Sequence, residues 1–166
     1  MAAPYDGLEM PVALQALTER EAIEDALNRF LFGMDSNNTE LFDSAHTEDA
    51  RWELSGSSGG RVLSGLKAIH EECFDPTISK LDTTHMVTGT RINITKSGSE
   101  AVMTAIFNAQ HYAAGQGKVK GSMFFYTGGL YKIDFIKDAT AGLWKIKCFA
   151  MKCLWSEGDV RVMGHD

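Results

Sequence analysis

Four long segments with strand-like composition occupy the second half of this 166-residue chain, and they limit its fold more than any other feature. The segments cover residues 84–95, 100–113, 121–137 and 142–155. β-Branched and aromatic side chains are frequent in them, and the connections between them are short and contain Gly or Ser. This pattern predicts an antiparallel meander of long strands.

The first half of the chain predicts three helices. Thr18 and Glu21 form a capping box, in which a hydroxyl and a carboxylate each satisfy a backbone amide at a helix start. A second short helix is expected after residues 38–39, and a third over residues 66–73 that ends before Pro76. The first helix repeats apolar residues along one face, which must pack on another apolar surface: Ile23, Ala26, Leu27, Phe30, Leu31 and Met34.

A hairpin is predicted between the helical segments. Ala50, Trp52 and Leu54 alternate with polar residues, and the sequence SGSSGG then turns the chain back through Val62 and Leu63. Helices first and a meander afterwards are typical of the α+β class rather than of alternating βα units.

The last strand segment predicts a β-bulge. Trp144, Ile146 and Cys148 alternate with lysines, but Phe149, Met151, Cys153 and Trp155 continue the apolar series at the opposite parity. One inserted residue would place both groups on the same inward face and would bend the strand.

Length and composition favour one soluble globular domain. We expect it to span residues 14–158, between an N-terminal arm at 1–13 and a C-terminal tail at 159–166. The net charge is −6 and no run of Lys or Arg occurs, which disfavours nucleic acid or an anionic membrane as a partner. No apolar stretch approaches ~18 residues and the N-terminus lacks the pattern of a secretory signal, so a cytoplasmic protein is expected.

Asp35, His85 and His111 are the candidate catalytic residues. Strand parity places His111 on the apolar face of its segment and His85 beside Val87 on the preceding one, while Asp35 ends the first helix. An imidazole with a pKa near neutrality can take a proton and return it elsewhere, and a carboxylate beside it fixes its tautomer. The three groups would meet if the sheet folds over the helix.

Other interpretations of these residues stay open. Each histidine could be a satisfied core residue, and two histidines with a carboxylate also describe a facial metal triad, of which His46-Thr47-Glu48 contains a fragment. We expect His46 and His70 on the surface and His165 in a tail.

Two further chemistries find little support in the sequence. The glycines of residues 56–60 lack the following Lys of a phosphate-binding loop, and no G-x-S-x-G motif occurs. The three cysteines, Cys73, Cys148 and Cys153, show no metal-ligand spacing and are expected to be reduced core thiols.

Several stretches resemble, in order and spacing, the SnoaL-like family of the nuclear transport factor 2 superfold, and within it the scytalone dehydratases. They are FLFGMDSNNTELFDSAHTEDARWEL, TTHMVTG, QHY, GLYKIDF and LWKIKCFAMKCLW. The resemblance implies a cone-shaped, highly curved, mixed or antiparallel sheet, an α+β barrel, that packs on N-terminal helices around a pocket. It also implies a small lyase, isomerase, cyclase or hydrolase that is usually cofactor-free and homo-oligomeric.

The resemblance assigns roles residue by residue. Asp35 matches the aspartate paired to a histidine, His85 matches that histidine, and His111 matches the second active-site histidine. Met34 stands where the family has one pocket tyrosine. The position of a second pocket tyrosine of the family falls near Leu54. The family's Ser/Asn pair falls near Gly129 and Tyr131, so scytalone itself is not the expected substrate. The expected pocket residues are Leu31, Met34, Trp52, Leu54, Phe107, Phe125, Tyr131, Met151 and Trp155.

Together these features predict a cofactor-independent dehydratase, double-bond isomerase or cyclase. Its substrate would be an apolar, oxygenated small molecule, such as a polyketide or terpenoid intermediate of secondary metabolism. His85, oriented by Asp35, would move a proton, and His111 would act as a second acid or base, or as a donor to an enolate oxygen. The alternative is a non-catalytic module of the same fold that binds small molecules or assembles oligomers.

We expect neither a cofactor nor a metal. A homo-oligomer, either a dimer or a trimer, is expected because Phe124, Leu130 and Ile136 place apolar side chains on the face opposite Phe125.

Overall fold

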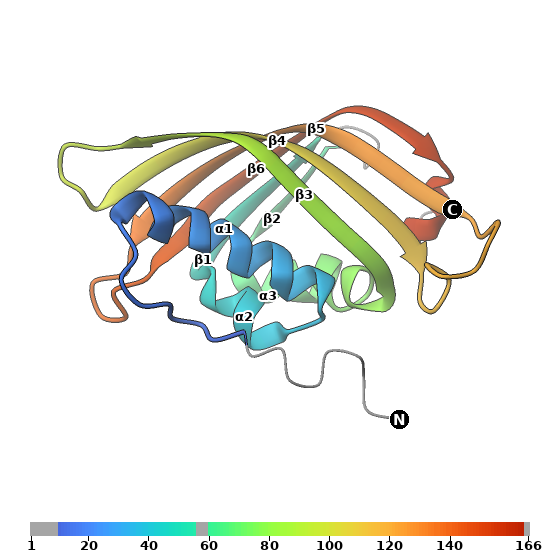
Figure 1. The fold of residues 1–166 in the computed structure, drawn as a ribbon, viewed down its shortest axis with the longest axis horizontal. Coiled ribbons are helices and arrows are strands. Elements are labelled where there is room, and N and C mark those ends of the chain that lie inside the picture. The colour runs from blue at the N-terminus through green and yellow to red at the C-terminus, as the bar shows by residue number, and fades with distance from the viewer. Residues whose placement is uncertain (1–9, 56–59, 165–166) are drawn as a thin grey trace.

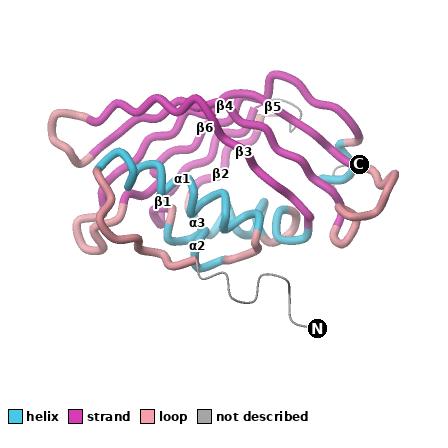
Figure 2. Tube along the Cα trace, in the orientation of Figure 1, coloured by secondary structure: helices cyan, strands magenta, loops and turns pink. Residues whose placement is uncertain are grey.

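The computed structural model describes residues 10–55 and 60–164, in which a six-stranded sheet curves over three α-helices (Figure 1). Most of the expected N-terminal arm, the middle of the hairpin turn and His165 lie outside the described residues. The α-helices lie together on the concave side of the sheet (Figure 2). The chain is therefore an α+β fold with its helices on one face of the sheet.

The helices begin where the sequence predicts. Helix α1 spans Glu19–Asp35 and starts at the capping box, where the Thr18 backbone N–H donates to the Glu21 carboxylate at 2.7 Å. Helix α2 spans Thr39–Ser44 and is capped by the Asn38 side chain. Helix α3 spans only Leu66–Ile69, because the chain continues as a π-helical turn over His70–Phe74. Two short 3₁₀ turns complete the helical elements, at Ile78–Lys80 and Val160–Met163.

The sheet is mixed and open. Its strands are β1 (His46–Ser55), β2 (Arg61–Ser64), β3 (Leu81–Ile94), β4 (Glu100–Ala113), β5 (Phe124–Lys137) and β6 (Trp144–Gly158). The order across the sheet is β2-β1-β6-β5-β4-β3, and β1 pairs parallel to β6 while all other neighbours are antiparallel. The predicted meander is β3 to β6. Strands β2 and β3 are the two edges, so the sheet does not close into a barrel.

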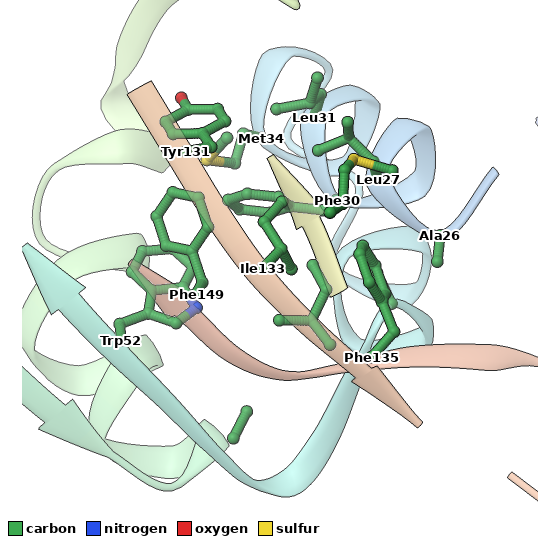
Figure 3. Packing of buried hydrophobic residues seen from close by; sticks show 14 of the residues in the cluster. Ala26, Leu27, Phe30, Leu31, Met34, Trp52, Tyr131, Ile133, Phe135 and Phe149 are labelled. Atoms are coloured by element: carbon green, nitrogen blue, oxygen red, sulfur yellow. The ribbon is translucent and has the colours of Figure 1, made fainter. Parts of the chain in front are cut away.

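The core fills the space between α1 and the concave face of the sheet. The inward side chains of β5, among them Tyr131, Ile133 and Phe135, lie in one row in Figure 3, facing Phe30 and its neighbours on α1. All three strand residues and Phe30 are at most 3% exposed. Burial of each such side chain contributes about 1.5–3 kcal/mol, so this layer holds the sheet to the helix.

A buried arginine fixes the position of α1. The Arg29 guanidinium donates to the Asp25 carboxylate at 3.0 Å, to the Ser44 carbonyl oxygen at 2.5 Å and to the Trp144 carbonyl oxygen at 2.7 Å. These bonds satisfy a charge that is only 2% exposed, and they join α1 to α2 and β6.

Strand β6 contains two bulges rather than one. The register against β5 shifts first at Lys147, just before the switch that the sequence indicates after Cys148, and brings Phe149 and Met151 to the inner face opposite Ile133 and Tyr131. Cys148 therefore pairs with Asp134 and does not continue the inward series of Trp144 and Ile146. A second shift at Leu154 changes the parity again. The sequence suggests only the first bulge, because the residues after it keep one apolar parity.

The outer face of the sheet carries exposed apolar side chains. Met86, Ile106, Leu130, Leu154 and Trp155 are between 43% and 56% exposed. Within the described residues, no helix has the length and apolar character needed to cross a membrane.

Candidate active site

Asp35 and His85 form a charge-assisted pair where α1 ends beside β3. One carboxylate oxygen of Asp35 lies 2.7 Å from His85 Nδ1, and the other accepts the His85 backbone N–H at 2.8 Å. The side chains are 17% and 7% exposed. A carboxylate can only accept, so Nδ1 carries the proton. The two hydrogen bonds to Asp35 fix the orientation of the His85 ring.

His111 lies beside His85 on β4. The two ring centroids are 5.5 Å apart and the ring planes are nearly perpendicular, at 84°. His111 Nδ1 donates to the carbonyl oxygen of Phe125 at 3.0 Å. Burial is the main cause that lowers the His111 pKa from its ordinary 6.5 to about 4, and the neighbouring His85 acts in the same direction. His111 is therefore a neutral imidazole at neutral pH.

Both histidines line a cavity of about 100 Å³ between the sheet and the helices. This is on the order of the ~150 Å³ apolar cavities that hold benzene, so the space suits a ring-sized molecule. Asp35 stands behind His85 and does not line the cavity. Most of the wall is apolar, and seven residues of the expected pocket contribute to it: Met34, Trp52, Leu54, Phe107, Phe125, Tyr131 and Met151.

Two residues of the expected pocket lie elsewhere. Leu31 is buried in the core on α1 and does not reach the cavity. Trp155 lies on the outer face, where it packs edge-on against Tyr126 with ring centroids 5.0 Å apart. The second bulge of β6 is the reason, since it pairs Trp155 with Gly128, whose missing side chain leaves room for the indole.

The wall also contains residues that sequence reasoning missed. Thr127 shares its strand parity with Phe125 and Tyr131, so the periodicity of β5 could have found it. Val160 and Met163 come from the last 3₁₀ turn, which the sequence assigns to a tail. In the sequence, only the i, i+3 spacing of these two apolar residues in a polar stretch indicates that they share one face of a turn. The remaining residues of this group are Phe30, Arg61, Glu72, Cys73, Thr77, Ile78, Ala109 and Phe149.

His46 is a core residue, which contradicts the expectation of a surface position. It is 2% exposed, its Nδ1 donates to the Phe42 carbonyl oxygen at 2.8 Å, and its Nε2 accepts from the Trp52 indole at 3.3 Å. Burial lowers the pKa of His46 to about 4. Both ring nitrogens are occupied, so the His46-Thr47-Glu48 fragment offers no free imidazole ligand.

His70 is partly buried between two carboxylates rather than fully exposed. Its Nε2 lies 2.6 Å from Asp43 and its Nδ1 3.1 Å from Asp75. Burial alone would lower its pKa, but the hydrogen bonds to Asp43 and Asp75 outweigh burial and raise it.

The described residues show neither an activated thiol nucleophile nor a metal site at the cavity. Cys73 reaches the wall, but burial raises the pKa of its thiol to about 11, so it is no thiolate nucleophile at neutral pH. Within the two described ranges, no three His, Cys, Asp or Glu side chains are grouped closely enough to hold a metal.

The arrangement can move protons in an apolar environment. Neither His85 Nε2 nor His111 Nε2 has a hydrogen-bond partner among the described residues, and both rings face the cavity. Because each Nδ1 holds its proton toward a fixed acceptor, each ring, when it carries a single proton, offers a lone pair at Nε2.

Comparison with known proteins agrees with this fold. The family model described as a SnoaL-like domain matches residues 15–149. The chain is also 43% identical over 165 residues to "Terrestric acid biosynthesis cluster protein E" of Penicillium crustosum, and the alignment covers 99% of each chain.

Solved structures share the architecture at lower identity. A candidate scytalone dehydratase from Novosphingobium aromaticivorans superposes with a TM-score of 0.70 at 20% identity, over 85% of this chain and 87% of that one. A type 2 hexachlorocyclohexane dehydrochlorinase (LinA) gives a TM-score of 0.66 at 18% identity, over 84% and 88%. These likenesses concern the fold.

The family match and the long alignment show that the chain belongs to the SnoaL-like family of the nuclear transport factor 2 superfold.

Proposed function

We propose that this protein is an enzyme that transfers a proton to and from carbon, as a dehydratase, double-bond isomerase or cyclase. The observation that supports this most is the meeting of two imidazoles in one apolar cavity, with a carboxylate behind one of them. The proposed chemistry needs only side chains of this chain and no cofactor.

His85 is the proposed base. Its Nε2 takes the proton from a substrate C–H, and the Asp35 carboxylate stabilises the imidazolium that forms. His111, neutral and fixed by Phe125, is the second proton acceptor in the proposal. The proton then returns to another carbon in an isomerisation, or leaves with a hydroxyl group as water in a dehydration.

The proposed substrate is an apolar, oxygenated small molecule of secondary metabolism. The mostly apolar wall of the cavity supports an apolar substrate. The name of the 43%-identical Penicillium crustosum relative, which refers to a terrestric acid biosynthesis cluster, supports a substrate of secondary metabolism.

Deuterium exchange tests the proposal even while the product is unidentified. The protein is incubated in D₂O with a panel of apolar β-hydroxy ketones and enones, and incorporation is followed by mass spectrometry. We expect His85→Ala and His111→Ala to lower the rate by ~10²- to 10⁴-fold, the usual contribution of general acid–base catalysis. His70→Gln is the matched control, because His70 lies outside the cavity wall, and its rate should stay near wild type.

Two results would reject this mechanism. Full exchange in both His85→Ala and His111→Ala would remove the proposed bases. Saturable binding of the panel compounds without exchange, unchanged in His85→Ala, would favour the non-catalytic binding module.

We also propose a homo-oligomer, either a dimer or a trimer. The exposed apolar side chains of the outer face, such as Ile106 and Leu130, support it. Sedimentation analysis should show an assembly that Leu130→Lys weakens. A wild-type monomer at micromolar concentration would contradict this part of the proposal.

A further inference from the structure

The proposed function needs a hydrogen-bond donor in the cavity that the two histidines do not supply. When a base removes a proton next to a carbonyl group, negative charge develops on the carbonyl oxygen and must be stabilised by a donor. His111 cannot supply it, because its only proton is committed to the Phe125 carbonyl oxygen. His85, as the base, starts with a lone pair on the nitrogen that faces the cavity. The donor must be a third group.

Tyr131 is held rigidly in the cavity wall. It is 3% exposed, its ring stacks on Phe107 with centroids 4.2 Å apart and planes at 6°, and the edge of Phe149 lies against it at 4.8 Å. Tyr131 stands at the cavity end of the β5 row, and Figure 3 shows its hydroxyl oxygen pointing away from Ile133 and Phe135.

The Tyr131 hydroxyl has no protein partner among the described residues. No hydrogen bond joins it to another described group, yet its oxygen keeps some accessible surface, unlike the fully enclosed hydroxyl oxygen of Thr83. The oxygen therefore reaches the cavity space. Burial and the nearby Asp35 charge raise its pKa, so the phenol keeps its proton.

We propose that Tyr131 is a catalytic hydrogen-bond donor that holds the carbonyl oxygen of the substrate. This inference rests on the proposed function and adds to it the residue of this chain that binds the carbonyl oxygen of the substrate.

The proton and electron balance is complete within the cavity. The C–H bond breaks and its proton joins Nε2 of the base. The electron pair forms a carbon–carbon double bond, and the carbonyl π pair moves to the oxygen, which accepts the Tyr131 hydrogen bond. The enolate then expels a β-hydroxyl, which takes the imidazolium proton and leaves as water, or it takes that proton at another carbon. Tyr131 keeps its own proton throughout.

Binding of an oxyanion probe tests Tyr131 separately from catalysis. 4-Nitrophenolate carries its charge on an oxygen like that of an enolate, and nitrobenzene is a neutral molecule of similar shape. We expect wild type to bind the phenolate more tightly than nitrobenzene, and Tyr131→Phe to lower that preference by roughly 10- to 100-fold, as for loss of one hydrogen bond to a charged group. Nitrobenzene affinity should be unchanged, because phenylalanine retains the stacked ring.

Tyr126→Phe is the matched control. The Tyr126 hydroxyl donates to Asn108 at 3.4 Å and its ring packs on Trp155 at the outer face. The Tyr126→Phe variant should keep the wild-type preference for 4-nitrophenolate over nitrobenzene. In unmodified protein, the Tyr131 hydroxyl proton should also shift downfield in NMR spectra when 4-nitrophenolate is added, a readout that does not depend on folding of a variant.

The outcomes separate this inference from the proposed function. The same preference in Tyr131→Phe, no preference in wild type, or no shift of the hydroxyl proton would overturn it. If Tyr131 governs phenolate binding but no deuterium exchange occurs, the inference stands and the proposed function fails. Where exchange occurs, Tyr131→Phe should slow it by ~10²- to 10³-fold with little change in nitrobenzene affinity.

Discussion

The two cavity histidines differ in the group that holds Nδ1, and this difference assigns their roles. Nδ1 of His85 faces a carboxylate, which favours the positively charged ring, whereas Nδ1 of His111 faces a peptide carbonyl oxygen. A carboxylate stabilises an imidazolium more than a carbonyl oxygen does. Our proposal therefore assigns the role of base to His85.

Asp35→Asn tests the carboxylate directly. An amide can still bond the ring, but it removes the charge and can present its NH₂ group, which selects the wrong tautomer. We expect exchange to fall by ~10²- to 10⁴-fold, while nitrobenzene still binds. Asp43→Asn, beside His70 outside the cavity, is the control. Equal rates in Asp35→Asn and wild type would show that the pair is structural only.

Thr83 offers a test of stability at a single atom. Its hydroxyl oxygen is buried without a partner, on the residue that pairs with His111 across β3 and β4. Thr83→Val keeps the shape and removes the unsatisfied group, so the free energy of unfolding should rise by about 1 kcal/mol and Tm by about 2–4 °C. Thr84→Val on the exposed side of β3 should change neither by as much. A lower Tm for Thr83→Val would mean that this hydroxyl does have a partner.

Individual elements show where sequence periodicity succeeds and where it fails. The bulge at Lys147 is visible because apolar residues continue on both sides of it at opposite parity. The bulge at Leu154 is invisible, because the strand end after it is exposed and carries no apolar alternation. The periodicity therefore predicts a pocket position for Trp155, although this residue lies on the outer face. His85 and His111 lie in regularly alternating stretches of β3 and β4, where the periodicity gives the face that the structure shows.

Gly33 makes possible the contact between α1 and α2. A Cβ atom added there would lie 2.6 Å from the Phe42 backbone nitrogen and 2.7 Å from its Cα. Glycine to alanine in a helix ordinarily stabilises by about 1 kcal/mol, but this overlap should destabilise Gly33→Ala by about 1–3 kcal/mol in chemical denaturation. Asn28→Ala, at an exposed position of α1, should stabilise slightly. A more stable Gly33→Ala would show that the helices can separate at no cost.

At the scale of the whole molecule, the sequence predicts the layers but not every contact between them. Helix order and the meander follow from caps and periodicities, which also place Asp35 at a helix end and the two histidines on apolar strand faces. That the three groups meet depends on the curvature of the sheet over α1, which only the resemblance to the family implied. The burial of His46 does not, because its position follows from α2 packing on β1, a contact between elements that no local pattern encodes. The cavity contribution of Val160 and Met163 depends in the same way on how the chain end folds back.

Buried histidines should give the protein a characteristic pH dependence. His46 and His111 have pKa values of about 4 against an ordinary 6.5, because burial disfavours the charged ring. The unfolded chain therefore binds more protons between these values. The contribution of the two histidines to the free energy of unfolding is therefore complete above pH 6.5. It declines as pH falls toward 4, by about 3 kcal/mol for each buried ring.

The measurement is urea unfolding across that pH range. His111→Gln should show a shallower decline than wild type, even if it is less stable at pH 7. His70 acts in the opposite sense, because its pKa is raised: its contribution is present below pH 6.5 and is lost as pH rises through its folded pKa. An identical decline in His111→Gln would mean that His111 is not buried as a neutral ring.

The protonation of the cavity histidines, measured by ¹H–¹⁵N NMR of histidine-labelled protein between pH 7.5 and 4, tests the proposed chemistry most directly. We predict that His111 stays neutral until about pH 4, with its proton on Nδ1 and a bare Nε2. We also predict that His85 holds a proton on Nδ1 throughout, and that Asp35→Asn perturbs this signal but not that of His70. A proton on Nε2 of neutral His85 or His111, or a charged His111 at pH 7, would contradict the proposed roles of both histidines.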